Sequence, residues 1–98
     1  MARVEITARA LSDLERLFEF KAARNARKAR EQLLSVRRAL GLLADHPLLG
    51  RDAEDGRREL ILLRGRDGHI AKYRWLPAEE LVLILAVRHH REAGYSEE

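Results

Sequence analysis

The alternation of apolar and polar residues divides the chain into a short strand, two helices and three further strands. Near the start, ARVEITA places Val4 and Ile6 on one face and charged or hydroxyl residues on the other, the period-two pattern of a strand with one solvated side. Later runs have strand composition and are separated by the turn-forming RGRDG and PAEE. These runs, which we expect to form an antiparallel meander, are 57–63, 69–76 and 81–89.

Two amphipathic helices are predicted between the first strand and the meander. Ser12, followed three residues later by Glu15, forms a capping-box pattern, and apolar residues then recur at helical spacing to about Arg24. Asn25 can cap the second helix, which should end before Pro47 because proline forces its predecessor out of helical geometry. The apolar seam of this second helix is Ala26, Ala29, Leu33, Val36, Leu40 and Leu43. We expect a helical hairpin, with coiled-coil dimerisation through the seam as the alternative.

This order of elements predicts an α+β fold in which the helical hairpin packs on one face of a small sheet. In the middle run of the meander, Ala71, Tyr73 and Trp75 share one face, which we expect in the core. Lys72 and Arg74 share the other face. The last run is apolar on both faces, as a central strand would be.

Composition excludes several classes of protein. At 98 residues the chain has room for one hydrophobic core, so we expect a single domain over residues 1–98. It has 46% hydrophobic and 36% charged residues, with no apolar window long enough for a membrane span and no apolar signal sequence. We therefore expect a cytoplasmic protein without a membrane partner. The chain has no cysteine, and the acids of the polar loop 48–56 match no ligand spacing, so neither a metal nor a cofactor is predicted.

Positive charge is concentrated in the helical region. The net charge is +3, yet segment 21–38 holds seven basic residues and a single acid, Glu31. Such a concentration suits a polyanion or an acidic protein partner, and a solvated helix face is the alternative.

A second concentration of positive charge is expected on the sheet face that the helices leave open. Lys72 and Arg74 lie on this face, and Arg88 joins them if the last strand is in register. Arg64 and Arg66 belong to the neighbouring hairpin tip. Several guanidinium groups on one face of a curved sheet make a cationic groove of phosphate size.

Three stretches of the sequence carry a family resemblance. They are the strand start Arg58, Glu59 and Leu60, the pair Tyr73 and Arg74, and the ending from Arg88 to Tyr95. With them the whole chain resembles the toxins of the RelE/ParE superfamily, which belong to bacterial type II toxin-antitoxin systems and serve plasmid stabilisation. The resemblance implies two possible activities on one fold. ParE-like members inhibit DNA gyrase by protein contact, and RelE-like members cut messenger RNA on the ribosome.

For the RelE-like activity, the resemblance implies a catalytic set of Arg88, His89 and Tyr95. The arginine would stabilise charge on the phosphorane, and His89 or His90 would transfer protons. In a ParE-like protein no catalytic set is needed, and the histidines have structural roles. The segment LLGRDAEDG is acidic where RelE-like members carry lysines. This departure favours a gyrase inhibitor that is not an enzyme, with a ribosome-dependent endonuclease as the alternative.

A non-toxic nucleic-acid-binding module is the third interpretation. It lacks stacking aromatic residues, because Tyr73 and Trp75 are expected in the core and only Tyr95 is left.

Two sets of basic residues are expected to contact partners. A cognate antitoxin with an acidic and apolar tail should fold across the helical hairpin and the sheet edge, where its charge is complemented by Lys21, Arg24 and Lys28. The target, whether gyrase or the ribosome with its messenger RNA, should be contacted by Arg58, Arg64, Arg66, Lys72, Arg74 and Arg91.

Overall fold

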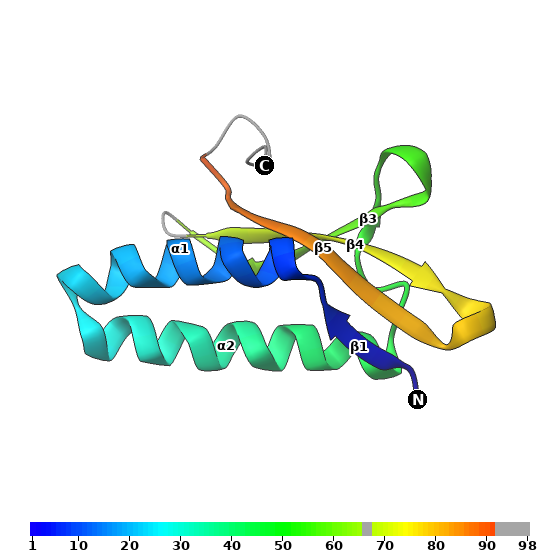
Figure 1. Cartoon of the computed structure of the whole chain (residues 1–98), viewed down its shortest axis with the longest axis horizontal. Coiled ribbons are helices and arrows are strands. Elements are labelled where there is room, and N and C mark those ends of the chain that lie inside the picture. Colours follow the sequence, from blue (N-terminus) through cyan, green and yellow to red (C-terminus); the bar gives the residue numbers. More distant parts are fainter. Residues whose placement is uncertain (66–67, 92–98) are drawn as a thin grey trace.

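Two helices form a hairpin on one face of a five-stranded mixed sheet (Figure 1). The computed structural model describes residues 1–65 and 68–91. The elements are β1 (Arg3–Ile6), α1 (Ala8–Arg24), α2 (Ala26–Asp45), β2 (Arg51–Asp52), a 3-10 helix (Glu54–Gly56), β3 (Arg58–Leu63), β4 (His69–Leu76), a second 3-10 helix (Pro77–Glu79) and β5 (Leu81–His89). The predicted α+β fold is confirmed.

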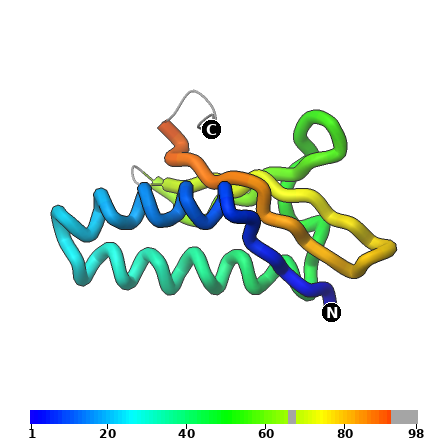
Figure 2. The backbone as a smooth tube through the Cα atoms, viewed as in Figure 1, coloured from blue at the N-terminus to red at the C-terminus, as the bar shows by residue number. Residues whose placement is uncertain are grey.

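The sheet has the order β1-β5-β4-β3-β2. Strands β3, β4 and β5 form the predicted antiparallel meander, and β1 runs parallel to β5 with Arg3 opposite Leu81. Figure 2 shows the blue first strand beside the orange last one. β5 therefore has a strand on each side, as predicted for a central strand, with Val82 and Ile84 buried and the alternate residues Leu81 and Leu83 partly buried. The segment 48–56, predicted as a loop, contributes the two-residue edge strand β2 and a 3-10 helix.

The predicted start of the first helix is wrong. Helix α1 begins at Ala8, and its N-cap is Thr7 rather than Ser12. The Thr7 hydroxyl accepts the Ala10 N–H at 3.1 Å and donates to the Ile84 carbonyl at 2.8 Å. One side chain thus satisfies the helix end and fastens it to β5. The pattern at Ser12 is purely local and carries no information about this distant partner.

The predicted ends of the second helix are confirmed. The Asn25 side chain accepts the Lys28 N–H at 3.0 Å, and the helix ends at Asp45, before Pro47. The hairpin turn between the helices projects beyond the sheet in Figure 1. The buried part of the predicted seam consists of Ala29, Val36, Leu40 and Leu43. Ala26 and Leu33 are exposed, so the seam is shorter than the pattern indicated.

The core lies between the helices and the central strands. Tyr73 and Ala71 of β4 are fully buried, together with Val82 and Ile84 of β5. Trp75, expected beside them, is only partly buried. It lies near the end of β4, where the β4–β5 hairpin extends past the helices (Figure 1).

Beyond the end of β1, a buried carboxylate of α1 accepts a hydrogen bond from the edge of β5. The pairing of β1 stops at Ile6, opposite Ile84. Further along β5, Asp13 of α1, only 1% exposed, accepts the Val87 N–H at 2.9 Å. This charge-assisted bond replaces the missing strand bond and ties α1 to β5. Among the described residues, neither helix has the length and apolar character that crossing a membrane requires.

Candidate partner-binding groove

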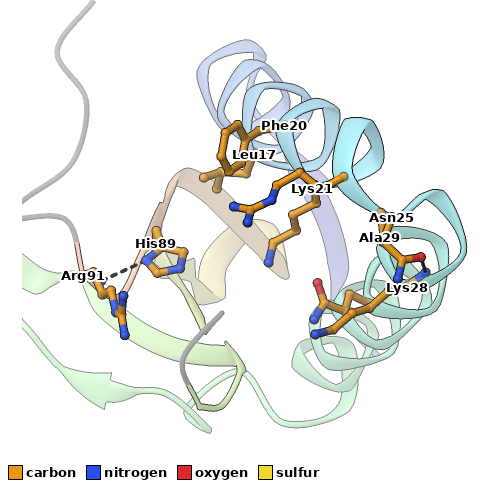
Figure 3. Close-up of a pocket in the computed structure, with 10 residues that line it drawn as sticks. Leu17, Phe20, Lys21, Asn25, Lys28, Ala29, His89 and Arg91 are labelled. Atoms are coloured by element: carbon orange, nitrogen blue, oxygen red, sulfur yellow. Dashed lines mark hydrogen bonds between the residues drawn. The ribbon is translucent and has the colours of Figure 1, made fainter.

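A groove of about 610 Å³ lies between the helical hairpin and the end of β5 (Figure 3). We call it the basic groove. Its lining residues are Leu17, Phe20, Lys21, Arg24, Asn25, Lys28, Ala29, Gln32, His89 and Arg91. Four of these described lining residues are cationic, namely Lys21, Arg24, Lys28 and Arg91. No lining residue in the list is an aspartate or a glutamate. The groove therefore combines an apolar floor with a net positive rim.

The helix ends account for the position of this charge. Lys21 and Arg24 lie in the last turn of α1, where the helix dipole favours cations. Lys28 lies in the first turn of α2, which has no acidic residue although the dipole favours one there. The dipole of α2 thus adds to the positive potential of the groove. Lys28 at this position does not stabilise α2, and its charge indicates a surface suited to an anionic partner.

Phe20 is the aromatic residue of the groove that sequence reasoning missed. Its side chain is 64% exposed, and the Arg24 guanidinium lies 5.6 Å from the centroid of its ring. An exposed aromatic ring among cations is a typical anchor for a binding partner. The sequence position could have indicated that Phe20 is exposed, because Phe20 does not belong to the buried face of α1, which includes Leu17 and Phe18.

The histidines form a ladder from the core to the groove. His69 is fully buried, with its ring centroid 5.4 Å from that of Phe18 and 5.7 Å from that of His89. The His89 ring in turn stacks on His90 at 5.0 Å. His89 Nδ1 accepts the backbone N–H of Arg91 at 3.1 Å, the dashed line in Figure 3. His89 therefore faces the helices and positions the chain that carries Arg91.

Arg88 lies on the opposite face of β5. It is paired with Ile70, whereas His89 is paired with His69, and adjacent strand residues point to opposite faces. Arg88 Nη1 lies 3.4 Å from the His89 carbonyl and 3.3 Å from that of His90. The two described members of the proposed RNA-cleaving set thus do not converge on one point. The third member, Tyr95, lies outside the described residues.

The open face of the sheet carries the predicted cations. The β4–β5 register places Lys72 and Arg74 on the same face as Arg88, as expected from the sequence. Glu59 lies opposite Lys72 in the β3–β4 ladder, so this face also carries a carboxylate. Arg64 follows β3 and is exposed. Arg66, predicted to accompany it, lies outside the described part of the chain.

Arg58, also predicted to contact a target, lies on the helix-covered face. It is paired with the buried Tyr73. Its Nη1 donates to the Gly50 carbonyl at 2.6 Å, and its Nη2 lies 3.1 Å from the Asp52 carboxylate. These contacts hold the segment that follows α2 against β3.

Tyr73 and Gly50 form a tight contact beneath the same segment. The Tyr73 hydroxyl donates to the Pro47 carbonyl and accepts the Gly50 N–H, each at 2.8 Å. Burial raises the pKa of Tyr73, although the Gly50 N–H and the Arg58 charge act in the opposite direction. A Cβ atom on Gly50 would lie 2.6 Å from the Glu59 carbonyl oxygen and 2.7 Å from Tyr73 Cε1. Only glycine fits this position.

A second hollow of about 600 Å³ lies beside β2 and β3. We call it the charged hollow, and it is lined by Arg51, Asp52, Ala53, Glu54, Asp55, Arg57, Glu59 and Lys72. Arg51 Nη2 lies 2.8 Å from Glu59 Oε1, and Arg57 Nη1 lies 3.9 Å from Asp55 Oδ2. Acidic and basic side chains therefore compensate one another here. Within residues 1–65 and 68–91, no group of three or more acidic or histidine side chains is arranged to hold a metal ion.

Comparison with known protein families identifies the chain. A family model described as the ParE toxin of the type II toxin-antitoxin system parDE matches residues 4–94. The match includes both helices, strands β2 to β5, β1 from Val4 onward and every residue of the basic groove. A search of curated proteins finds no match. The resemblance to the RelE/ParE toxins is confirmed.

Proposed function

Because the chain belongs to the ParE toxin family of type II toxin-antitoxin systems, we propose that it inhibits DNA gyrase by protein contact and is neutralised by a cognate antitoxin. In this proposal the toxin acts in the cytoplasm as a single domain, residues 1–98, and serves plasmid stabilisation. It needs neither a cofactor nor a catalytic set. The type II family implies an antitoxin partner.

The basic groove supports the part of the proposal that concerns the antitoxin. An acidic and apolar tail would find charge complements in Lys21, Arg24 and Lys28 and an apolar contact on Phe20. Tails of this kind are disordered when free and fold on binding, which suits a groove between elements. We assign Arg91 to the same contact, since it lines the groove together with these three residues.

One observation carries the choice of a gyrase inhibitor over a messenger RNA nuclease: Arg88 and His89 lie on opposite faces of β5. Cleavage requires a cation and a proton-transfer group that converge on one phosphate. The acids Asp52 and Asp55 add to this argument. They occupy the segment where RelE-like enzymes carry lysines, and they lie near Arg58 and Arg57.

The open face is the surface that we propose for the target. Lys72, Arg74 and Arg88 share this face, and Arg64 is exposed after β3. A target surface on the open face would leave the helical side of the molecule to the antitoxin.

The test uses purified components. The protein should block supercoiling of relaxed plasmid by DNA gyrase and leave translated messages intact in a cell-free system. Lys72→Glu combined with Arg74→Glu should weaken the inhibition at least about tenfold, because reversed charges at a contact surface repel the partner. Arg37→Glu combined with Arg38→Glu is the matched control, since both arginines are exposed on α2. Codon-specific cuts in translated RNA, lost in a folded Arg88→Ala variant, would instead establish the nuclease.

A further inference from the structure

The solvent side of α2 carries a set of exposed arginines, Arg27, Arg30, Arg37 and Arg38. We call it the arginine face. Within residues 1–65 and 68–91, the ion pairs involve other side chains, so these guanidinium groups are available to an external anion. We propose that the arginine face binds the phosphates of duplex DNA, as a binding activity separate from the proposed inhibition of gyrase.

The helical period sets these arginines in two rows. At 3.6 residues per turn, Arg30 and Arg37 fall on one side of Leu34, and Arg27 and Arg38 fall on the other. The members of the first row are about 10.5 Å apart along the axis, and those of the second row about 16.5 Å. Leu34 itself is 46% exposed between the rows. The face therefore presents two lines of positive charge with a narrow apolar strip between them.

Two rows of cations on one helix fit the two strands that border the major groove of B-DNA. That groove is about 12 Å wide and admits an α-helix, whose diameter with side chains is about 10 to 12 Å. Each row of arginines would then lie beside one phosphate backbone, and guanidinium groups bind phosphates through paired N–H donors. The major groove of duplex RNA is too narrow for this contact. Duplex DNA is therefore the polyanion that the face fits best.

The position of α2 in the fold leaves this face accessible. The helix packs on α1, β3 and β1 with its other side. Its buried residues, Ala29, Val36, Leu40 and Leu43, all belong to that side. Figure 1 shows α2 along the lower edge of the helical layer, with α1 and the sheet above it. Helix α2 has 20 residues, so a surface about 30 Å long is open to a duplex.

The placement of acids distinguishes α2 from α1. The exposed side of α1 carries Glu15 and Glu19, whereas Glu31 is the one acid of segment 27–38. Charge therefore favours α2 as the DNA contact rather than the hairpin as a whole. Glu31 lies about one helical turn from Arg27, beside the second row. Its carboxylate should repel a phosphate there, so its neutralisation should strengthen DNA binding.

Counterion release gives this contact a measurable signature. Each phosphate that a protein neutralises contributes about −0.9 to the slope of log K against log salt concentration, so contacts by all the arginines of the face give a slope of about −3.6. Binding of this kind, without base contacts, has a dissociation constant of about 10⁻⁴ to 10⁻⁶ M at physiological salt. We expect an affinity in this range that falls steeply with salt.

Fluorescence anisotropy of the full chain with a labelled duplex of about 20 base pairs, at about 50 to 200 mM salt, tests the proposal. Arg30→Gln combined with Arg37→Gln should weaken binding about tenfold and make the salt slope shallower by about 2. The fold should be retained, because glutamine favours helices. Arg64→Gln combined with Arg74→Gln is the matched control, since it removes the same charge from other exposed positions. Equal losses in the two double variants would overturn the proposal, because net charge would then account for binding.

A second arm changes the acid and the nucleic acid. Glu31→Gln should tighten DNA binding about two- to threefold, and Glu79→Gln, which makes the same change of net charge at an exposed distant position, should tighten it less. Equal effects would show that the duplex does not lie on α2. A duplex RNA of the same sequence should bind at least about fivefold more weakly than the DNA, because its major groove excludes the helix. Equal affinity for both duplexes would overturn the assignment of DNA.

The result does not depend on the proposed function. Neither gyrase nor an antitoxin is present in the binding measurements, so their failure leaves that function standing, and the reverse also holds. Arg37→Glu combined with Arg38→Glu should abolish DNA binding while inhibition of gyrase through the open face is retained. Loss of both activities in this folded variant would overturn the separation of the DNA contact from gyrase inhibition.

Discussion

The basic groove and the charged hollow are almost equal in volume, about 610 and 600 Å³, and each is lined by several cationic side chains. They differ in their acids. The groove has no carboxylate among its described lining residues, whereas the hollow places acids beside its arginines at distances such as 2.8 Å between Arg51 and Glu59. The number of arginines along a stretch of sequence therefore does not identify a surface for an anionic partner. The placement of the acids decides it.

The two regions also differ in their role. Around the hollow, charged groups and Tyr73 fasten the segment after α2 to β3, so substitutions there should reduce stability and leave partner binding unchanged. In the groove, the cations lie on the surface of a helical hairpin that is already capped by Asn25. Substitutions there should reduce binding and leave stability unchanged. The following experiments test this crossed pattern.

The largest effect is expected from Gly50→Ala beside the hollow. The new Cβ atom would clash with the Glu59 carbonyl oxygen and the Tyr73 ring at 2.6 and 2.7 Å. We expect a loss of about 3 kcal/mol in the free energy of unfolding, measured by urea titration. Gly41→Ala is the control, because nothing lies within 4 Å of its added Cβ and alanine favours the helix. Equal stability of the two variants would show that the contact at Gly50 is not tight.

The next effect concerns the groove. Lys21→Gln combined with Lys28→Gln should weaken binding of the co-encoded antitoxin about thirtyfold, or ~2 kcal/mol, in a calorimetric titration. The melting temperature should be unchanged. Arg51→Gln combined with Arg57→Gln, which removes the same charge from the hollow, should change the affinity less than about threefold. If both pairs weakened binding equally, net charge rather than the groove would account for the affinity.

A smaller effect is expected from Tyr73→Phe. This change leaves the buried Gly50 N–H without the hydroxyl that accepts it, which costs about 1 to 2 kcal/mol. Binding to the antitoxin should be retained. A loss of affinity without a loss of stability would mean that Tyr73 takes part in binding. It would contradict the division between a stabilising hollow and a binding groove.

The same residue predicts a pH dependence. Because the pKa of Tyr73 is raised in the folded protein, the native state holds this proton more tightly than the unfolded state, whose pKa is about 10. Its contribution to stability is fully present below pH 10 and is lost as the pH rises through the folded pKa. Urea titrations from pH 8 to 11 should show a steeper alkaline decline for the native chain than for Tyr73→Phe.

The smallest effect is expected from Asp52→Asn, which removes an ion pair of the hollow. The Asp52 carboxylate lies 3.1 Å from Arg58 but is 87% exposed. Pairs of this kind contribute little, so the free energy of unfolding should fall by at most about 0.5 kcal/mol, and less in high salt. A loss comparable to that of Gly50→Ala would mean that ion pairs, rather than close packing, hold this region.

The sequence predicted the elements whose signals are local. The cap at Asn25, the helix end before Pro47 and the three strands of the meander follow from neighbouring residues and from periodicity. The cap at Thr7 and the role of Asp13 were missed because their partners, Ile84 and Val87, are distant in the sequence. Such contacts require knowledge of the fold.

In the candidate site, too, local sequence signals could be predicted and contacts between distant residues could not. Lys21, Arg24 and Lys28 were grouped from the charge of one segment, and their role in antitoxin binding stays a prediction. That His89 and Arg91 line the same groove follows only from the packing of α1 against β5. The register places Arg88 on the open face, as expected, and His89 on the opposite face, while the catalytic set of Arg88, His89 and Tyr95 stays a prediction.

The parallel pairing of β1 with β5 has a consequence for synthesis of the protein on the ribosome. Arg3 emerges from the ribosome long before its partner Leu81, which lies far along the sequence. High contact order of this kind delays folding until the distant strands can meet. The wall of the basic groove that β5 supplies is likewise missing from any nascent chain that stops before His89. Prematurely terminated chains are therefore left with an unpaired first strand and an incomplete groove.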